Sequence, residues 1–203
     1  AVTVTPVNDN TPAITSSATA SVAENTSAVM TVTATDADLP AQTLTYSIVG
    51  GADAAKFSIN ASTGALSFVT APDYEAPTDA GGTNVYDVTV QVSDGTLTST
   101  QAIAITVTPV NDNTPAITSS ATASVAENGT AVMTVTATDT DLPAQTLSYS
   151  IVGGPDAVKF SINSTTGALS FVTAPDFEAP TDAGADNVYD VTVQVSDGFL
   201  TDT

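Results

Sequence analysis

The stretch Val85 to Ser93, VYDVTVQVS, decides the fold of this chain. Its apolar side chains, Tyr86, Val88, Val90 and Val92, alternate strictly with polar ones. Successive side chains of a β-strand point to opposite faces of the sheet, so this pattern predicts a long strand with one buried face. The same nine letters recur at residues 188–196, and we therefore expect this strand twice.

Shorter alternating runs on either side of this strand predict further strands. They lie near Ile14, near Val22, at Ala28 to Thr35, at Leu44 to Ile48, in a hairpin from Phe57 to Phe68 that turns at Gly64, and at Ile103 to Val107. No stretch keeps the apolar spacing of an amphipathic helix. We therefore predict an all-β fold with about seven strands per repeat, arranged as a Greek-key, immunoglobulin-like β-sandwich.

The chain contains an internal repeat. Residues 1–100 match residues 104–203, an offset of 103, with only 14 substitutions, so both copies are expected to share one fold. We divide the chain into residues 1–10, the end of a preceding repeat plus its linker, residues 11–110, repeat 1, and residues 111–203, repeat 2. In this interpretation repeat 2 lacks its last strand and the chain is part of a longer protein.

The charge of the chain excludes several functions. The net charge is −20, and Lys56 and Lys159 are the only basic side chains. Such a surface repels nucleic acid and anionic membranes, and it repels itself unless cations intervene. No apolar run approaches the roughly 18 residues of a membrane helix, and the absence of cysteine rules out a disulfide scaffold.

A catalytic site is not indicated. The pair Asp73 and Glu75 has the composition of a glycosidase acid pair, but the chain has no Trp and no His, and no pattern that predicts an aromatic cleft. We predict that the protein is not an enzyme.

A stiff connector joins the two copies. It reads VTPVNDNTP at Val107 to Pro115, and the same letters occur at Val4 to Pro12. Proline fixes φ and removes a hydrogen-bond donor, so the segment is expected to be extended rather than part of a sheet interior. Its Asn-Asp-Asn cluster offers several oxygens within three residues, which suits a hard cation.

Carboxylates gather where predicted strands end. In repeat 1 these are Glu24, Asp36, Asp38, Asp73, Glu75 and Asp94. Strand ends collect at the two poles of a sandwich, so these acids are placed to act between domains. The remaining loop acids are expected to keep the surface soluble: Asp53, Asp79, Asp87, Asp156, Asp182, Asp186, Asp190 and Asp202.

Five motifs, taken together, resemble a known family. AEN at 23–25, DAD at 36–38, DYE at 73–75, SDG at 93–95 and NDNTP at 111–115 are similar to the calcium-binding motif series of cadherin repeats, most closely those of bacterial surface proteins. The motifs occur in the family's order in both copies. The resemblance implies a calcium site at the connector and extracellular use.

The ligands that the resemblance implies fall into one complete site and two half-sites. The complete site comprises Glu24, Asp73, Glu75, Asn111, Asp112, Asn113, Asp139, Asp141 and Asp197. The half-sites comprise Asn8, Asp9, Asn10, Asp36, Asp38 and Asp94 at one end, and Glu127, Asp176 and Glu178 at the other. Pro109 stands where the family usually has a linker aspartate, so we expect two or three Ca²⁺ ions at this connector.

The resemblance implies structural repeats of a secreted bacterial adhesin or filament, in which calcium stiffens the contact between neighbouring repeats and the array mediates surface attachment or biofilm cohesion. Three alternatives stay open. The module binds a ligand or carbohydrate, for which the exposed-phase aromatic Phe199 is a candidate; it adheres homophilically, as animal cadherins do; or residues 1–6 of one copy complete the sandwich of another and chains polymerise head to tail.

Overall fold

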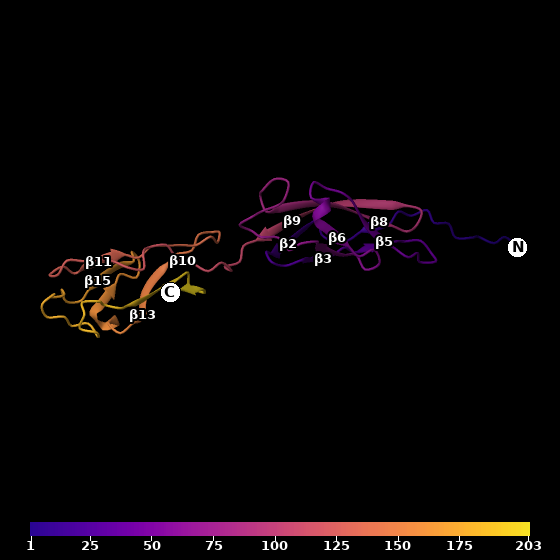
Figure 1. Ribbon diagram of the computed structural model, residues 1–203. Coiled ribbons are helices and arrows are strands. Elements are labelled where there is room, and N and C mark those ends of the chain that lie inside the picture. The colour runs from indigo at the N-terminus through magenta and orange to yellow at the C-terminus, as the bar shows by residue number, and fades with distance from the viewer. The chain divides into compact units, whose positions relative to one another are not determined.

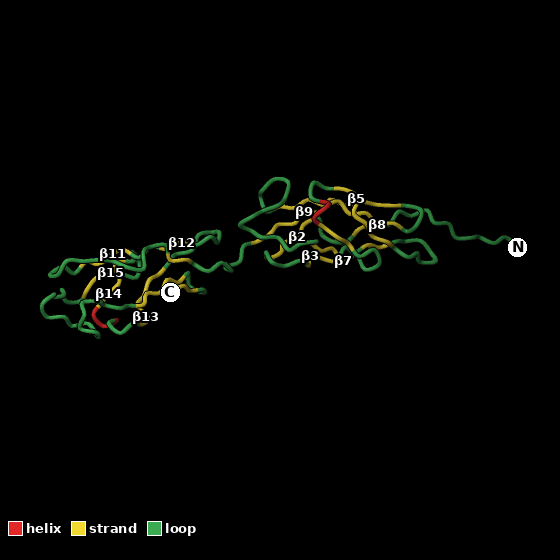
Figure 2. The backbone as a smooth tube through the Cα atoms, in the orientation of Figure 1, coloured by secondary structure: helices red, strands yellow, loops and turns green.

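The computed structural model describes residues 1–203, which divide into unit 1 (Ala1–Val110) and unit 2 (Asn111–Thr203) (Figure 1). Both units are built from strands, and helix is limited to one short 3₁₀ turn in each, η1 (Ala54–Lys56) and η2 (Ala157–Lys159) (Figure 2). Neither turn has the length or the apolar character needed to span a membrane. The predicted all-β fold is confirmed.

Unit 1 contains a four-stranded sheet in the order β2-β9-β8-β5, a three-stranded sheet in the order β3-β7-β6, and a two-stranded pair β1-β4. All neighbours are antiparallel except β2 and β9, which run parallel. The strands are β1 (Ala13–Ile14), β2 (Thr19–Ala23), β3 (Ala28–Thr31), β4 (Ala34–Thr35), β5 (Thr45–Gly50), β6 (Phe57–Ile59), β7 (Ala65–Phe68), β8 (Val85–Ser93) and β9 (Thr98–Thr108).

The stretch Val85 to Ser93 forms β8, as predicted. It pairs along its whole length with β9, from Val85 opposite Thr106 to Ser93 opposite Thr98. Its four alternate apolar side chains, Tyr86, Val88, Val90 and Val92, are at most 1% exposed. The period-two pattern therefore identified the buried face correctly.

Three aromatic rings join the two larger sheets of unit 1. Phe57 and Phe68 stack with ring centroids 4.6 Å apart, and the edge of Tyr86 from the other sheet meets Phe68 at 5.1 Å. Offset and edge-to-face aromatic contacts add to the stabilisation that burial provides. The core of unit 1 is thus a sandwich interior closed at its centre by aromatic packing.

The predicted count of about seven strands is too low for unit 1, which has nine strand segments. The stretch Ala28 to Thr35, expected as one strand, splits into β3 and β4 because its two parts have different partners. β3 pairs with β7, whereas β4 pairs with β1. Alternation shows that a residue is extended but does not show which strand it pairs with.

Unit 2 repeats this plan with fewer strands. Its sheets have the orders β11-β15-β14, β13-β16-β17 and β10-β12. The strands are β10 (Ala116–Ile117), β11 (Ala131–Thr134), β12 (Ala137–Thr138), β13 (Ser148–Gly153), β14 (Phe160–Ile162), β15 (Ala168–Phe171), β16 (Thr192–Ser196) and β17 (Thr201–Asp202).

The counterpart of β2 is not a strand in unit 2, and the 203 residues include only the first part of the counterpart of β9. Residues 122–126 have the same sequence as β2, TASVA, yet they are not a strand. In unit 1 the only partner of β2 is β9, and unit 2 retains only the two-residue start of that strand, β17. A single unpaired strand has no ladder to hold it, so the segment loses regular structure.

Four acids expected on the surface are buried instead. Asp53, Asp79, Asp156 and Asp182 are 3–7% exposed. Asp53 accepts hydrogen bonds from the backbone N–H groups of Ala80 (2.7 Å) and Asp87 (2.9 Å), so it ties the long loop to β8. The prediction that these acids act as solubilising residues is wrong because loop backbone donors satisfy their carboxylates.

Candidate metal centres

Four groups of three carboxylates lie in the structure, and within each group one oxygen of every residue is within 4.8 Å of the others. We name each group after one member. They are the Glu24 group (Glu24, Glu75, Asp112), the Asp141 group (Asp139, Asp141, Asp197), the Asp38 group (Asp36, Asp38, Asp94) and the Glu127 group (Glu127, Asp176, Glu178).

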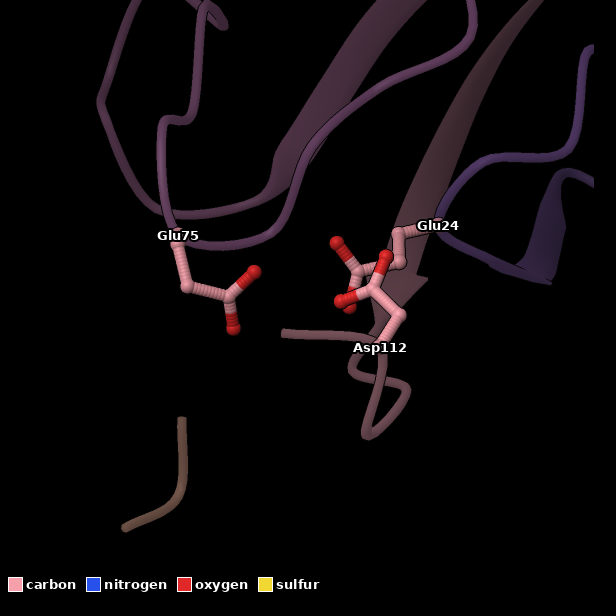
Figure 3. A group of neighbouring side chains, drawn as sticks. All are labelled: Glu24, Glu75 and Asp112. Atoms are coloured by element: carbon pink, nitrogen blue, oxygen red, sulfur yellow. The ribbon is translucent and has the colours of Figure 1, made fainter. Parts of the chain in front are cut away.

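The Glu24 group is built around a buried carboxylate at the end of β2. Glu24 is 2% exposed, and it accepts hydrogen bonds from the N–H groups of Tyr74 (2.6 Å) and Val110 (2.7 Å). It therefore ties the long loop and the start of the connector to the end of the sheet. The carboxylate of Glu75 points toward those of Glu24 and Asp112 (Figure 3). Asp112 follows Val110 by two positions in the chain.

The Asp141 group lies where unit 2 begins. Asp141 is 1% exposed, and the backbone N–H of Asn113 donates to its two oxygens at 3.1 and 3.2 Å. The N–H of Asp141 in turn donates to Asp139 Oδ1 at 3.1 Å. Burial of Asp141 thus fixes the second half of the connector against its own unit.

Asp197, the third member of this group, is held in its ionised form. Burial raises the pKa of Asp197, but hydrogen bonds from the N–H groups of Phe199 and Leu200, and from the Asn111 side chain, outweigh burial and bring the pKa below its ordinary value. Both N–H donors lie 2.7 Å from Oδ1. A carboxylate kept ionised in this way is available to a cation.

The Asp38 group repeats this geometry in unit 1. Asp38 accepts hydrogen bonds from the N–H groups of Asp9 (3.1 Å) and Asn10 (2.9 Å). The side-chain amide of Asn10 is the main cause that lowers the pKa of Asp38. The pKa of Asp94 is lowered chiefly by hydrogen bonds from the N–H groups of Leu97 and Thr96. The segment before β1 is therefore anchored on its unit just as the connector is on unit 2.

The Glu127 group is the exposed counterpart of the Glu24 group. All three of its members are exposed, and Glu127 keeps one of the equivalent contacts, from the N–H of Phe177 at 3.1 Å. In unit 1 the second contact comes from Val110, which follows β9. The position that corresponds to Val110 lies beyond residue 203.

The donor set fits a hard cation. Asp36 Oδ2 and Asp139 Oδ2 are buried and have no hydrogen-bond donor, which is costly for an anionic oxygen unless a positive charge faces it. The basic side chains Lys56 and Lys159 lie in η1 and η2, outside all four groups. Oxygen-only ligands favour Ca²⁺, which accepts six to eight oxygens in irregular geometry.

The structure groups twelve of the fourteen acids that the sequence predicted as ligands; Asp9 and Asp73 belong to none of the four groups. Asp73 is not a member of the Glu24 group; its Oδ1 accepts hydrogen bonds from the N–H groups of Glu75 and Ala76. The Asn113 side chain donates an amide N–H to Asp141. The ligand roles assigned to all of the predicted site residues, Asp73, Asn111 and Asn113 included, stay predictions.

The sequence analysis missed one contact that organises the site, the hydrogen bond from Val110 to Glu24. Finding it requires knowing that β2 runs parallel to β9, because only then do the end of β2 and the start of the connector meet. The alternation of side chains carries no signal for that pairing.

Comparison with known proteins agrees with this geometry. The cadherin domain family model matches residues 18–108 and 121–202. Human protocadherin Fat 1 is 33% identical over 178 residues, which cover 83% of this chain and 4% of that protein. Human protocadherin-23 is 33% identical over 209 residues, which cover 97% of this chain and 6% of that protein. The chain thus spans a small part of the length of these relatives.

Solved structures resemble the chain at the level of the fold and the sequence. The crystal structure of the EC22-24 segment of mouse cadherin-23 has a TM-score of 0.64 and 28% identity, and the match covers 97% of this chain and 63% of that one. Extracellular cadherin domains 3–6 of protocadherin gamma B2 have a TM-score of 0.66 and 25% identity, covering 98% of this chain and 51% of that one. The chain belongs to the cadherin family and consists of two tandem cadherin repeats.

Proposed function

We propose that these repeats are extender modules of an extracellular array, in which calcium bound around the connector stiffens the contact between neighbouring repeats. Cadherin domains are non-enzymatic, adhesion-related modules that bind Ca²⁺ at interdomain linkers. The assignment of residues 11–110 and 111–203 as the two repeats, and of the connector as their calcium joint, is part of this proposal.

One observation supports the joint most strongly: adjacent connector residues serve two different acid groups. Asp112 is a member of the Glu24 group, and the next residue, Asn113, donates its backbone N–H to Asp141. A cation held by the Glu24 group, which includes Asp112, would therefore be only one residue along the chain from the contact with the Asp141 group. Ions at these groups would draw both onto the short connector.

The charges bound the number of ions. The proposed acids are Glu24, Asp73, Glu75, Asp112, Asp139, Asp141 and Asp197, which carry −7 in total. Two Ca²⁺ ions leave −7 + 4 = −3 and three leave −7 + 6 = −1, whereas like charges about 4 Å apart repel by about 1 kcal/mol or more per pair. Pro109 contributes a carbonyl oxygen where a carboxylate is usual in the family, so we propose two or three ions.

The bacterial setting is part of the proposal, since the relatives described above are animal proteins. Its support is the makeup of the chain: no cysteine, a net charge of −20, and repeats that differ at 14 of 100 matched positions. Extracellular calcium modules bind at about 10⁻⁴ to 10⁻³ M, so such an array is flexible inside a cell and stiff outside it. That behaviour suits a secreted adhesin or filament.

Isothermal titration calorimetry with calcium tests the site. The wild-type chain should bind at least two ions with dissociation constants of about 10⁻⁴ to 10⁻³ M. Asp112→Asn should lose one ion or weaken binding by about tenfold, because it removes a charged ligand from the Glu24 group. Asp87→Asn, an exposed acid outside all four groups, is the matched control. Absence of calcium binding, or equal isotherms for the two variants, would refute the proposed site.

A further inference from the structure

Asn128 and Gly129 form the only Asn-Gly pair in the sequence. Asn128 lies in a turn with Glu127, and both Asn128 and Gly129 are exposed. In an Asn-Gly pair the backbone nitrogen of the glycine can close a five-membered ring with the side-chain amide carbon of the asparagine, because glycine has no Cβ that crowds this nitrogen. The pair is therefore a candidate for a reaction between side chain and backbone.

Repeat 1 has the same turn with a different residue after the asparagine. Asn25 has a φ of 59° and Asn128 a φ of 62°, and each donates its backbone N–H to a proline carbonyl of the long loop at 2.9 Å. Thr26 follows Asn25, whereas Gly129 follows Asn128. Asn25 is exposed as well, in the unit where β9 is complete, so exposure of this turn is a property of the fold.

The side chain of Asn128 is free to rotate. Two other exposed asparagines, Asn60 and Asn163, are held, because the Oδ1 of each accepts two backbone N–H groups at 3.0 Å. No hydrogen bond holds the side chain of Asn128. Its amide carbon can therefore approach the backbone nitrogen that follows it.

Two Asp-Gly pairs could form the same ring, but their side chains are fixed. Asp94 and Asp197, each followed by glycine, are 8% exposed. The Oδ1 of each accepts two backbone N–H groups at 2.7 Å. Of the three pairs that the sequence offers, the structure thus leaves one free to react.

We propose that Asn128 is a site of spontaneous modification, at which its side-chain amide becomes a carboxylate. The backbone nitrogen of Gly129 attacks Cγ of Asn128, so that an N–Cγ bond forms and the Cγ–Nδ2 bond breaks. Nδ2 leaves as ammonia with the proton of the Gly129 N–H. Water then opens the succinimide ring at either carbonyl and gives aspartate or isoaspartate. No oxidant or reductant takes part, and water is the only reactant from outside the chain.

The new carboxylate lies next to Glu127 in the chain, which is a member of the Glu127 group. The net charge changes from −20 to −20 − 1 = −21. Asn25, beside Glu24, keeps its amide because Thr26 crowds the attacking nitrogen. The two repeats thus become chemically different with age. An effect on cation binding at the Glu127 group rests on the proposed function, whereas the modification itself does not.

Mass spectrometry of the 203-residue chain, aged at neutral pH and physiological temperature, tests the reaction. Trypsin cleaves the denatured chain after Lys56 and Lys159, its only basic residues, so Asn25 and Asn128 fall in different fragments. Fragmentation then locates the mass gain that replacement of NH₂ by OH produces, and an unaged digest corrects for conversion during digestion. Asn128 should be converted at least about tenfold faster than Asn25.

An exchange of the following residues provides matched variants. Gly129→Thr should slow Asn128 to the rate of Asn25, and Thr26→Gly should raise Asn25 to the rate of Asn128. Both positions are exposed, and a Cβ at Gly129 would lie 3.4 Å from the Ala126 carbonyl oxygen, so the fold accommodates each residue. Circular dichroism checks that both variants are folded.

Ageing in urea separates the contribution of the fold from that of the sequence. Unfolding releases Asp94 and Asp197 from their hydrogen bonds, so isoaspartate should form at these positions at least about tenfold faster in urea than in the folded chain, whereas Asn128 should change by less than about threefold.

Three results would overturn the proposal: an unmodified Asn128 in the aged folded chain, equal rates at Asn128 and Asn25, or rates that the exchanged residues do not transfer. Isoaspartate formation at Asp197 that is equally fast in the folded chain and in urea would contradict the selection by hydrogen bonds.

Discussion

At the scale of single residues, the donor that faces each carboxylate oxygen separates the structural acids from the candidate metal ligands. Asp79 accepts hydrogen bonds from the N–H groups of Gly81, Thr83 and Asn84, so its charge is satisfied by the loop that contains it. Asp139 Oδ2 is buried without any donor. A cation is the partner that such an oxygen lacks.

The hydrogen bonds that Asp79 accepts should make the free energy of unfolding depend on pH. Burial raises the pKa of Asp79, but the N–H groups of Thr83, Asn84 and Gly81 outweigh burial and bring the pKa below its ordinary value of 3.8. The stabilisation is therefore present above that value and is lost as the pH falls through the lowered pKa. Asp79→Asn should lower the free energy of unfolding by about 1–2 kcal/mol at pH 7.

Urea unfolding in chelator at pH 7, 5 and 3 measures this effect. The difference between wild type and Asp79→Asn should shrink as the pH falls below about 3.8. The exposed Asp87, changed to Asn, should alter stability by no more than about 0.5 kcal/mol at any of these pH values. A difference for Asp79→Asn that is independent of pH would contradict the assigned cause.

Single residues also show which features of the candidate sites can be predicted from the sequence. The acids of the four groups were all predicted, because Asp and Glu at strand ends are visible in the letters. The burial of Asp53 and Asp79 was not predicted, because their donors are backbone N–H groups and every residue except proline has one. Which loop folds back onto which carboxylate is a property of the fold.

At the scale of elements, β9 distinguishes the two units. In unit 1 it pairs with β8 over nine residues and with β2 over five. In unit 2 the corresponding β17 pairs with β16 over two residues, and residues 122–126 and 188–191 are not strands. Sequence identity at β8 therefore does not produce the same element, because a strand requires its neighbour.

Hydrogen exchange compares the two elements directly. Residues 85–93 and 188–196 have the same sequence, so their intrinsic exchange rates are nearly equal and any difference reports structure. Amides of residues 188–191 should exchange about 100-fold faster than those of residues 85–88, since they lack a paired strand.

Equal protection of residues 85–88 and 188–191 would contradict the view that the strand depends on a paired neighbour.

The strands themselves were largely predicted, whereas their partners were not. Period-two alternation identified β8 and its buried face, and it placed the hairpin of β6 and β7 around Gly64. It did not reveal that β2 runs parallel to β9 or that Ala28 to Thr35 divides between two partners. Alternation records burial of one face and is the same for either direction of pairing.

At the scale of the whole molecule, net charge affects how closely neighbouring repeats can approach each other. A net charge of −20 opposes close approach of neighbouring repeats, and in the proposed function bound calcium removes that opposition where acids gather. The fold contributes by placing its acids at strand ends, and the connector contributes Asp112 to the Glu24 group and a backbone hydrogen bond from Asn113 to Asp141. The proposed rod is thus stiff only where calcium is plentiful.

Small-angle X-ray scattering of the chain, in millimolar calcium and again in excess chelator, tests this claim most directly. The account predicts a distance distribution in calcium that is longer and narrower, since the connector is held in one geometry, and a broader one in chelator, since the acid groups repel and the connector flexes. Identical distributions in the two conditions would contradict it and show that these acids do not govern the geometry between the repeats.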